Sequence, residues 1–229
     1  MILAINTSTL QFSMALMTDD ETVLGEFSVS KGKGHFGGLM PALDSLLTTT
    51  RSDIHDLRAV IVAIGPGSFT GLRVGLSTAK GLCHALEVPI IGISSLKALA
   101  SQIPNAHPPI TPIIDSRKEE FFTAQFVWNA GHGLTRRMED TCLKFGEFPS
   151  AFKEKTLFIG NNFTHQAPLI EETLGHRALL APAHFWIPRA SAVGYLGLKR
   201  FHVSDFDNAQ DLNPLYLRPP DIRPNRNPA

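Results

Sequence analysis

Residues 59–75 read Ala-Val-Ile-Val-Ala-Ile-Gly-Pro-Gly-Ser-Phe-Thr-Gly-Leu-Arg-Val-Gly, and this stretch decides the fold. Its first six residues form an apolar, largely β-branched run, which is typical of a strand buried on both faces. Residues 71–86 follow with helical spacing. Residues 65–70 therefore turn a buried strand into a helix, with Ser68 or Thr70 as the N-cap. Gly65 and Gly67 allow backbone angles that other residues avoid.

The turn at residues 65–70 has two open interpretations. A strand-to-helix turn leaves free N–H groups at the helix N-terminus, and such groups bind anions. The spacing of Gly65, Gly67 and Gly71 matches neither the phosphate-loop pattern nor the dinucleotide pattern, however. The turn is therefore either a purely structural element, or one that contacts phosphate through Gly67 and Ser68.

The helix predicted over residues 71–86 carries a row of small residues. Gly71, Gly75, Ala79 and Cys83 recur at every fourth position. Such a row allows a second element to approach the helix closely, because i±4 rows are the grooves of helix packing. Each glycine inside a helix costs about 0.5–1 kcal/mol relative to alanine, so close packing must offset that cost. The neighbour is either another part of this chain or a partner protein.

Composition indicates a folded protein with no net charge. The chain has 229 residues, a formal net charge of +0 and two cysteines, Cys83 and Cys142. Zero net charge gives no overall attraction to nucleic acid or membrane. Two distant cysteines are typical of a reduced cytosolic protein. The N-terminus lacks a basic leader and no apolar run approaches about eighteen residues, so we expect a soluble cytoplasmic protein.

Two halves of the chain predict the same order of elements. The first half predicts strands over residues 1–5, 12–17, 22–28, 59–64 and 88–93, and helices over 36–47, 71–86 and from Ser94 or Ser95. After a proline-rich linker at 102–112, the second half predicts strands over 110–114, 120–128, 134–143, 156–159 and 178–180, and helices over 145–152, 163–174 and 190–201. Each half reads βββαβαβα, which predicts a duplicated α/β architecture. We expect an N-terminal lobe at 1–104, a C-terminal lobe at 105–218 and a flexible tail at 219–229.

A duplicated βββαβαβα chain resembles the actin, sugar-kinase and heat-shock ATPase superfamily. That resemblance implies ATP between the lobes, with its phosphates against the hairpin turns at residues 6–9 and 115–117. The expected nucleotide or phosphate contacts are Thr7, Ser8, Gly67, Ser68, Asp115 and Arg117. The first turn carries Asn6 where an Asp is usual, and a neutral amide lacks the charge that Mg²⁺ prefers. We therefore do not expect this chain alone to hydrolyse ATP.

Five motifs follow one another along the chain: ILAINTS at 2–8, GPGSFTGLRVG at 65–75, STAKGL at 77–82, DSRKE at 115–119 and PLYLR at 214–218. Together they resemble the bacterial TsaB (YeaZ) family, which was formerly filed among glycoproteases. The resemblance implies a non-catalytic subunit needed for threonylcarbamoyl modification of adenosine 37 in tRNAs that read codons beginning with A. It also implies a catalytic partner, TsaD, an ATPase partner, TsaE, and a homodimer when the chain is alone. ATP or ADP and metal would lie on the partners, and tRNA would bind only through the complex.

The same resemblance implies that the helices of the N-terminal lobe pack against a partner. The expected interface residues are Leu39, Met40, Leu43, Leu47, Gly71, Leu72, Gly75 and Ala79. No metal site and no catalytic residue is expected in this chain. No two histidines lie three or four residues apart, and neither Gly-x-Ser-x-Gly nor His-Glu-x-x-His occurs.

Two other functions stay open. The chain could be an active small kinase or ATPase of the same superfamily, with Asp115 and the turn after Gly65 handling phosphate, although the acidic pair that such chemistry needs is incomplete. It could also bind tRNA directly through Lys31, Lys33, Arg136, Arg137 and the tail, although such clusters are more often solvated surface.

Overall fold

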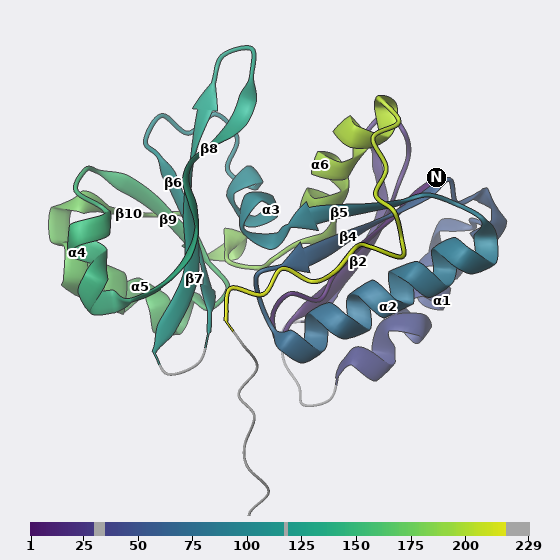
Figure 1. Cartoon of the computed structure of the whole chain (residues 1–229), viewed down its shortest axis with the longest axis horizontal. Coiled ribbons are helices and arrows are strands. Elements are labelled where there is room, and N and C mark those ends of the chain that lie inside the picture. The colour runs from purple at the N-terminus through teal and green to yellow at the C-terminus, as the bar shows by residue number, and fades with distance from the viewer. Residues whose placement is uncertain (30–34, 117–118, 219–229) are drawn as a thin grey trace, which may run out of the picture.

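The computed structural model describes residues 1–29, 35–116 and 119–218, which form two lobes side by side (Figure 1). The first lobe contains a five-stranded sheet in the order β3-β2-β1-β4-β5. Its strands are β1 (Ile2–Asn6), β2 (Phe12–Met17), β3 (Val23–Val29), β4 (Ala59–Gly65) and β5 (Ile90–Ser94). The first three strands are antiparallel, and β4 and β5 continue the sheet in parallel from β1.

The second lobe repeats this topology. Its sheet has the order β10-β9-β6-β7-β8, so the first strand of the second half again lies at the centre. Its strands are β6 (Ile110–Asp115), β7 (Glu120–Asn129), β8 (Gly133–Lys144), β9 (Thr156–Gly160) and β10 (Ala178–Leu180). Strand β6 pairs antiparallel with β7 and parallel with β9, as β1 does with β2 and β4. The predicted duplicated, two-lobed α/β fold is confirmed.

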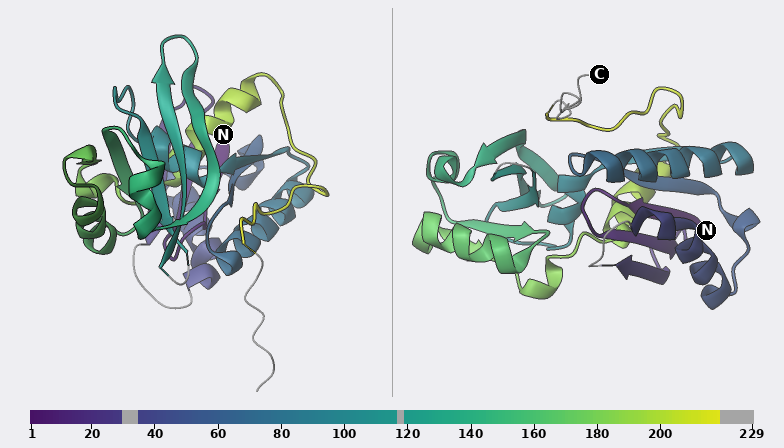
Figure 2. Two further views of the ribbon diagram at one scale, coloured as in Figure 1. Left: turned by 60° about the vertical axis from the view of Figure 1, so that its left-hand side comes forward. Right: turned by 90° about the horizontal axis from the view of Figure 1, so that it is seen from below.

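The helices cover the sheets from both sides (Figure 2). In β1, Leu3 and Ile5 face the core beneath α1 (Leu39–Thr50) and α2 (Phe69–Leu86), whereas Ile2 and Ala4 face the core beneath α6 (Ala190–His202). Successive side chains of a strand point to opposite faces, so burial on both faces explains the unbroken apolar runs in β1 and β4. Short 3₁₀ helices lie at His35–Gly38, Ile54–Asp56, Phe145–Glu147, Gly175–Arg177 and Ala183–Phe185.

The last helix of each half packs against the sheet of the other lobe. Helix α3 (Ser95–Ser101) buries Leu96 and Leu99 in the core of the second lobe, which is completed by α4 (Phe148–Ala151) and α5 (Phe163–Leu174). Helix α6 belongs to the second half of the sequence, yet it packs on β1, β2, β4 and β5. The boundary predicted at residues 104 and 105 therefore separates the two sheets, but it does not separate the helices that cover them.

Helices α1 and α2 begin at different residues from those predicted. Helix α1 starts at Leu39 rather than at residue 36, after the 3₁₀ turn, and Pro41 falls in its first turn, where no intrahelical N–H bond is required. Helix α2 starts at Phe69, because the Ser68 hydroxyl accepts the Gly71 N–H at 3.3 Å and caps the helix. The N-cap role of Ser68 is confirmed.

After α6 the chain returns across both lobes as an extended segment, residues 203–218, which we call the strap (Figure 1). The strap first pairs with the edge of the first sheet, where Asp207 forms an antiparallel bridge with Ile90. Further on, the Leu215 N–H donates to the Ile64 carbonyl at 2.7 Å. The strap is therefore held against the first lobe at Asp207 and Leu215, and the predicted flexible tail at 219–229 lies outside the described residues.

Candidate functional site

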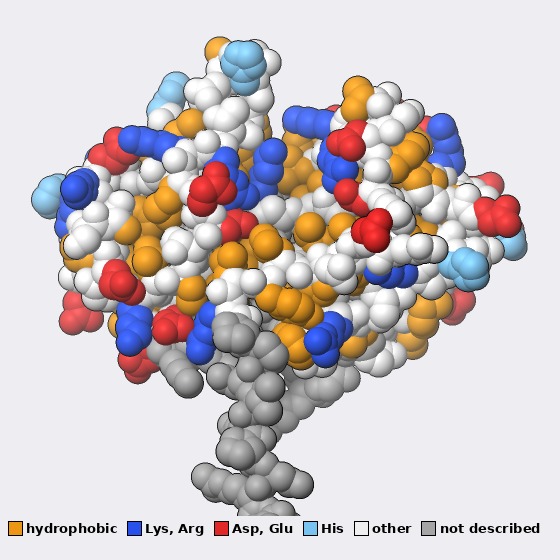
Figure 3. Space-filling view, in the orientation of Figure 1, with side chains coloured by type: hydrophobic (Ala, Val, Ile, Leu, Met, Phe, Trp, Pro, Cys, Tyr) orange, Lys and Arg blue, Asp and Glu red, His pale blue; other side chains and the backbone are white. Residues whose placement is uncertain are grey.

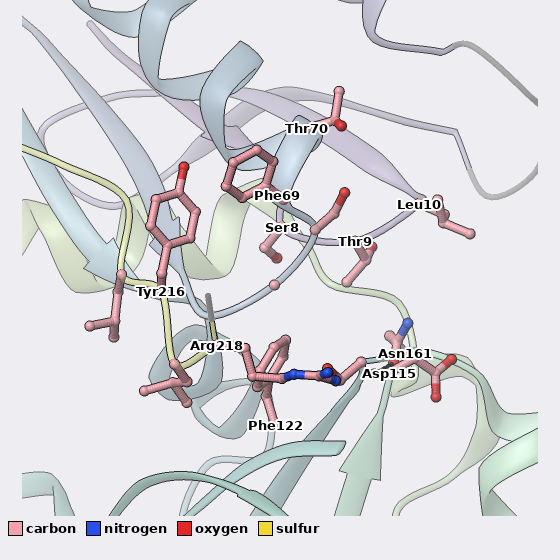
Figure 4. A pocket seen from close by; sticks show the side chains of 15 residues that line it. Ser8, Thr9, Leu10, Phe69, Thr70, Asp115, Phe122, Asn161, Tyr216 and Arg218 are labelled. Atoms are coloured by element: carbon pink, nitrogen blue, oxygen red, sulfur yellow. Dashed lines mark hydrogen bonds between the residues drawn. The ribbon is translucent and has the colours of Figure 1, made fainter. Parts of the chain in front are cut away.

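A cavity of about 400 Å³ lies between the two lobes (Figure 4). It is bounded by the first hairpin turn, the N-terminus of α2, the second hairpin turn and the end of the strap. Its lining includes Ser8, Thr9, Leu10, Gly67, Ser68, Phe69, Thr70, Asp115, Ser116, Phe122, Asn161, Leu215, Tyr216, Leu217 and Arg218. Of the predicted phosphate contacts, Ser8, Gly67, Ser68 and Asp115 meet in this cavity, and Arg117 lies outside the described residues.

The first hairpin turn uses its hydrogen-bond donors internally. The Asn6 side-chain oxygen accepts both the N–H of Ser8, at 3.1 Å, and the hydroxyl of Ser8, at 2.7 Å. The N–H of Ser68 donates to the Ser8 carbonyl at 2.7 Å. A phosphate at this turn would have to displace bonds that the buried groups already make, at a cost comparable to a lost hydrogen bond for each. Asn6 therefore satisfies the turn from within the chain.

Gly67 is required by the contact between the two turns. A Cβ atom placed on Gly67 would overlap the carbonyl oxygen of Ser8, so no other residue fits here without a backbone shift. Gly65, at the end of β4, has φ +116° and lies against the Leu215 carbonyl, and both conditions favour glycine. These two glycines hold the turn of α2 against the first hairpin and the strap, which supports the structural interpretation of the stretch at 65–70.

The second hairpin turn carries a carboxylate held by amides. Asp115 accepts the side-chain amide of Gln166 at 2.6 Å and that of Asn162 at 3.5 Å. Its backbone N–H donates to the side-chain oxygen of Asn161 at 3.0 Å. Across the described ranges, no group of three or more His, Cys, Asp and Glu side chains is placed to hold a metal ion. The carboxylate thus belongs to a hydrogen-bonded network with neutral partners.

Phe69 and Tyr216 line another part of the cavity, and Arg73 packs on them. The rings of Phe69 and Tyr216 lie 5.0 Å apart between centroids, and the Arg73 guanidinium lies 3.8 Å from the Phe69 ring centre. The Nε–H of Arg73 donates to the Tyr216 hydroxyl at 2.9 Å. Sequence reasoning did not find this cluster. Its signal was the PLYLR motif, whose Tyr216 was noted without a structural role.

The row of small residues on α2 faces inward, which corrects the predicted interface. A Cβ atom on Gly75 would overlap the hydroxyl oxygen of Thr7, a fully buried residue behind the first turn. The element that approaches α2 closely is therefore the first hairpin turn of this chain. The predicted interface residues Leu39, Leu43, Gly71, Leu72, Gly75 and Ala79 are all buried within the lobe, so they offer no surface to another protein. We call the row Gly71, Gly75, Ala79 and Cys83 the inner ridge.

A second row of small residues lies on the opposite, exposed face of α2. Ser77, Gly81 and Ala85 also recur at every fourth position, and all three are exposed. We call this row the outer ridge. A Cβ atom placed on Gly81 would meet no heavy atom of a neighbouring element within 4 Å. Of the residues predicted on α1, Met40 is 51% exposed and Leu47 is partly buried. The outward faces of α1 and α2 lie over the same side of the first sheet (Figure 2).

Comparisons with known proteins agree with this architecture. Residues 26–200 match the family model described as TsaD, tRNA N6-adenosine threonylcarbamoyltransferase. The chain is also 33% identical over 220 residues, 95% of its length and 93% of the relative's, to the tRNA threonylcarbamoyladenosine biosynthesis protein TsaB of Bacillus subtilis. The chain belongs to the TsaB family. The TsaB protein of Haemophilus influenzae is 26% identical to the chain, with 95% of the chain and 93% of the relative covered.

Solved structures share the fold. A Pseudomonas aeruginosa protein described as similar to peptidase YEAZ superposes with a TM-score of 0.79 at 22% identity, covering 95% of this chain and 99% of that one. The TsaB resemblance found in the sequence motifs is thereby confirmed over nearly the whole chain. Among the described residues, no helix combines the length and the apolar character that a membrane crossing requires.

Proposed function

We propose that the chain is a non-catalytic accessory subunit for threonylcarbamoyl modification of adenosine 37 in tRNAs that read codons beginning with A. It acts by binding a catalytic TsaD-type subunit, and a TsaE-type ATPase joins the assembly. This function operates in the cytoplasm, and tRNA contacts the chain within the complex. Family membership supports the pathway, and the outward faces of α1 and α2 support the binding role.

The outer ridge carries the proposal. Gly81 lies inside α2, an 18-residue helix, and no neighbouring element among the described residues comes within 4 Å of a Cβ atom placed on it. An exposed glycine inside a helix costs about 0.5–1 kcal/mol relative to alanine, and nothing within the lobe offsets that cost. A helix of a partner that packs along Ser77, Gly81 and Ala85 offsets it, because small residues allow the two backbones to approach closely. Met40 supplies exposed apolar area on α1.

The composition of the two outward faces fits a protein partner. Besides the outer ridge, α2 exposes Thr70, Arg73 and His84, and α1 exposes Met40, Pro41, Asp44, Ser45, Thr48 and Thr49. The few charges on these faces match the depletion of charged residues at the centre of a protein interface, where Met and Arg are enriched. A stable pairing would bury about 1,200–2,000 Å² in total. When the catalytic subunit is absent, the same surface pairs with a second copy of the chain, which gives a homodimer.

The decisive test is a leucine at Gly81. Gly81→Leu fills the outer ridge without touching any other element of the lobe, so the fold is retained while the partner's helix is kept away. We expect its affinity for a TsaD-type subunit to fall at least about a hundredfold, equivalent to about 2.7 kcal/mol. Isothermal titration calorimetry measures this affinity, and threonylcarbamoyl transfer to tRNA by the reconstituted complex should fall in parallel.

Gly146→Leu is the matched control. Gly146 is also exposed, lies in the second lobe, and has open space around its Cβ position. This variant should bind the partner as the wild type does. Unchanged affinity of Gly81→Leu, with both variants folded by circular dichroism, would remove the outer ridge from the interface. Transfer activity of the purified chain without a TsaD-type subunit would contradict the accessory role.

We propose no nucleotide or metal cofactor for the chain alone, and we assign ATP or ADP and metal to the partner subunits. The internal bonds of the first turn support this assignment, because Asn6 and Ser8 already occupy the groups that would meet phosphate. A kinase or ATPase role is therefore less favoured. Calorimetric titration with Mg·ATP separates the two functions, since micromolar binding with turnover would establish the enzyme.

A further inference from the structure

The strap is anchored on both lobes by side chains that enter their cores. Leu212 packs against the core beneath α1 and α2, and Leu217 packs against the core of the second lobe. Between them, the Leu215 N–H bonds to Ile64 at the end of β4. At its end, Arg218 forms an ion pair with Glu120 on β7 at 2.6 Å. The strap is thus fastened to the first lobe up to Tyr216 and to the second lobe from Leu217.

The backbone segment of the strap that passes from the first lobe to the second is too short to absorb a movement between them. Adjacent residues of an extended chain advance by at most about 3.6 Å, so Tyr216 and Arg218 are separated by at most about 7 Å along the backbone. A movement of the second lobe away from the first must therefore release Arg218 or pull on Tyr216. Because both residues line the cavity between the lobes, either event changes the shape of that cavity.

The first-lobe end of this connection lies on α2. The Tyr216 hydroxyl accepts the Arg73 Nε–H, and its ring packs on Phe69 in the first turn of the helix. Arg73 is exposed and lies four residues before Ser77, so it continues the outer ridge toward the start of the helix. Hydrophobic side chains gather on this part of the surface, over the strap and the start of α2 (Figure 3). Tyr216 itself is 38% exposed.

We propose that the strap couples the outer ridge of α2 to the second lobe. A protein docked on the ridge contacts Arg73, and Arg73 holds Tyr216. Through the short segment to Arg218, the position of Tyr216 fixes the second lobe and the cavity. The inference rests on the proposed function only in the identity of the partner, a TsaD-type subunit. The coupling between Glu120 and Tyr216 exists in the chain alone.

The first experiment uses the chain alone. Tyr195 and Tyr216 are the two tyrosines of the sequence, so incorporation of 3-fluorotyrosine gives one ¹⁹F resonance for the strap and one internal reference on α6. Glu120→Gln removes the ion pair of Arg218 in the second lobe. We expect the Tyr216 resonance to shift, the Tyr195 resonance to stay, and amide exchange at Leu215 to accelerate about threefold to fivefold.

Glu154→Gln is the matched control, because Glu154 forms an ion pair with Arg137 in the second lobe and has no contact with the strap among the described interactions. It should leave Tyr216 and Leu215 unchanged. If Glu120→Gln also leaves the Tyr216 resonance and Leu215 exchange at their wild-type values, the strap does not transmit the change and the proposal is overturned. This arm does not depend on any partner.

The second experiment adds a TsaD-type subunit. We expect partner binding to shift the Tyr216 resonance and to slow Leu215 exchange in the wild type, and Gly81→Leu to prevent both effects. A partner that binds with full affinity but leaves Tyr216 and Leu215 unaffected would overturn the coupling while the accessory role stands. If the partner does not bind, but Glu120→Gln shifts the Tyr216 resonance, the accessory role is overturned. The coupling through the strap within the chain then still stands.

Discussion

The two faces of α2 carry nearly the same pattern and meet opposite surroundings. On the inner ridge, Gly75 lies against Thr7, and there is no room for even one more carbon atom. On the outer ridge, Gly81 faces open space. Six residues separate these glycines, which places them on different sides of a helix with 3.6 residues per turn. A row of small residues thus leaves room for close packing on either face of the helix, and within the described residues the fold fills that room on the inner face.

The largest expected effect concerns α1, where a buried large side chain, Leu43, can be compared with an exposed one, Met40. Leu43→Ala should lower the free energy of unfolding by about 2–5 kcal/mol, because Leu43 is buried in the first-lobe core and its loss leaves a cavity. Met40→Ala, on the exposed face, should stay within about 0.5 kcal/mol of the wild type. Urea unfolding measures both. Equal losses would mean that the outward face is already packed within the chain.

Cysteine reactivity reports on the two ridges in one helix. Burial raises the pKa of the Cys83 thiol, on the inner ridge, to about 11. A cysteine introduced by Ser77→Cys on the outer ridge should keep a pKa of about 8.5. Since the thiolate is the reactive form, iodoacetamide at pH 8 should modify position 77 about 200-fold faster. The rate at Cys83 should rise about tenfold per pH unit until the pH approaches 11.

Peptide-level mass spectrometry distinguishes position 77 from Cys83 and Cys142. Labelling in denaturant, where both sites are exposed, provides the reference. Similar native rates at positions 77 and 83 would show that the inner ridge is open to solvent, which would break the comparison.

One methyl group on the inner ridge should be costly. We expect Gly75→Ala to lower the free energy of unfolding by about 1–3 kcal/mol, because the new Cβ overlaps the Thr7 hydroxyl. Thr7→Ala removes that hydroxyl, which makes no hydrogen bond within the described residues. The double variant should therefore recover part of the loss. A double-mutant cycle by chemical denaturation measures the coupling, and strictly additive effects would show that the two sites do not touch.

A methyl group added on the outer ridge should stabilise the fold. Gly81→Ala should raise the free energy of unfolding by about 0.5–1 kcal/mol, since alanine is the better helix former and no clash opposes it. This is the smallest of the four effects, and it has the opposite sign to Gly75→Ala. A loss of stability in Gly81→Ala would mean that a part of the chain covers this glycine.

Local patterns predicted most of the fold. The apolar runs of β1 and β4, the turn at 65–70 and the repeated order of elements all follow from short-range spacing, and the structure confirms them. The exchange of α3 and α6 between the lobes could not be read in this way. Helix α6 has an amphipathic pattern like any other helix, and that pattern does not specify which sheet it covers.

The residues of the cavity were predicted only in part. Ser8, Gly67, Ser68 and Asp115 follow strands whose ends meet at one edge, so their convergence follows from the topology. Tyr216 reaches the cavity because the strap returns across the molecule, about a hundred residues after the second hairpin turn. The residues expected at an interface on α2 are buried, and the sequence could not show this, because a period of four fits the inner ridge and the outer ridge equally well.

The placement of α6 has a consequence during protein synthesis. Strand β5 leaves the ribosome about a hundred residues before α6 is complete, a delay of about 5–20 s at typical elongation rates. Throughout that interval the nascent first sheet presents Ala4, Ile61 and their neighbours to water, because α6 supplies most of the helical residues in that core and α3 adds Ala98. We expect the newborn chain to need a chaperone that shields this face until translation delivers the last helix.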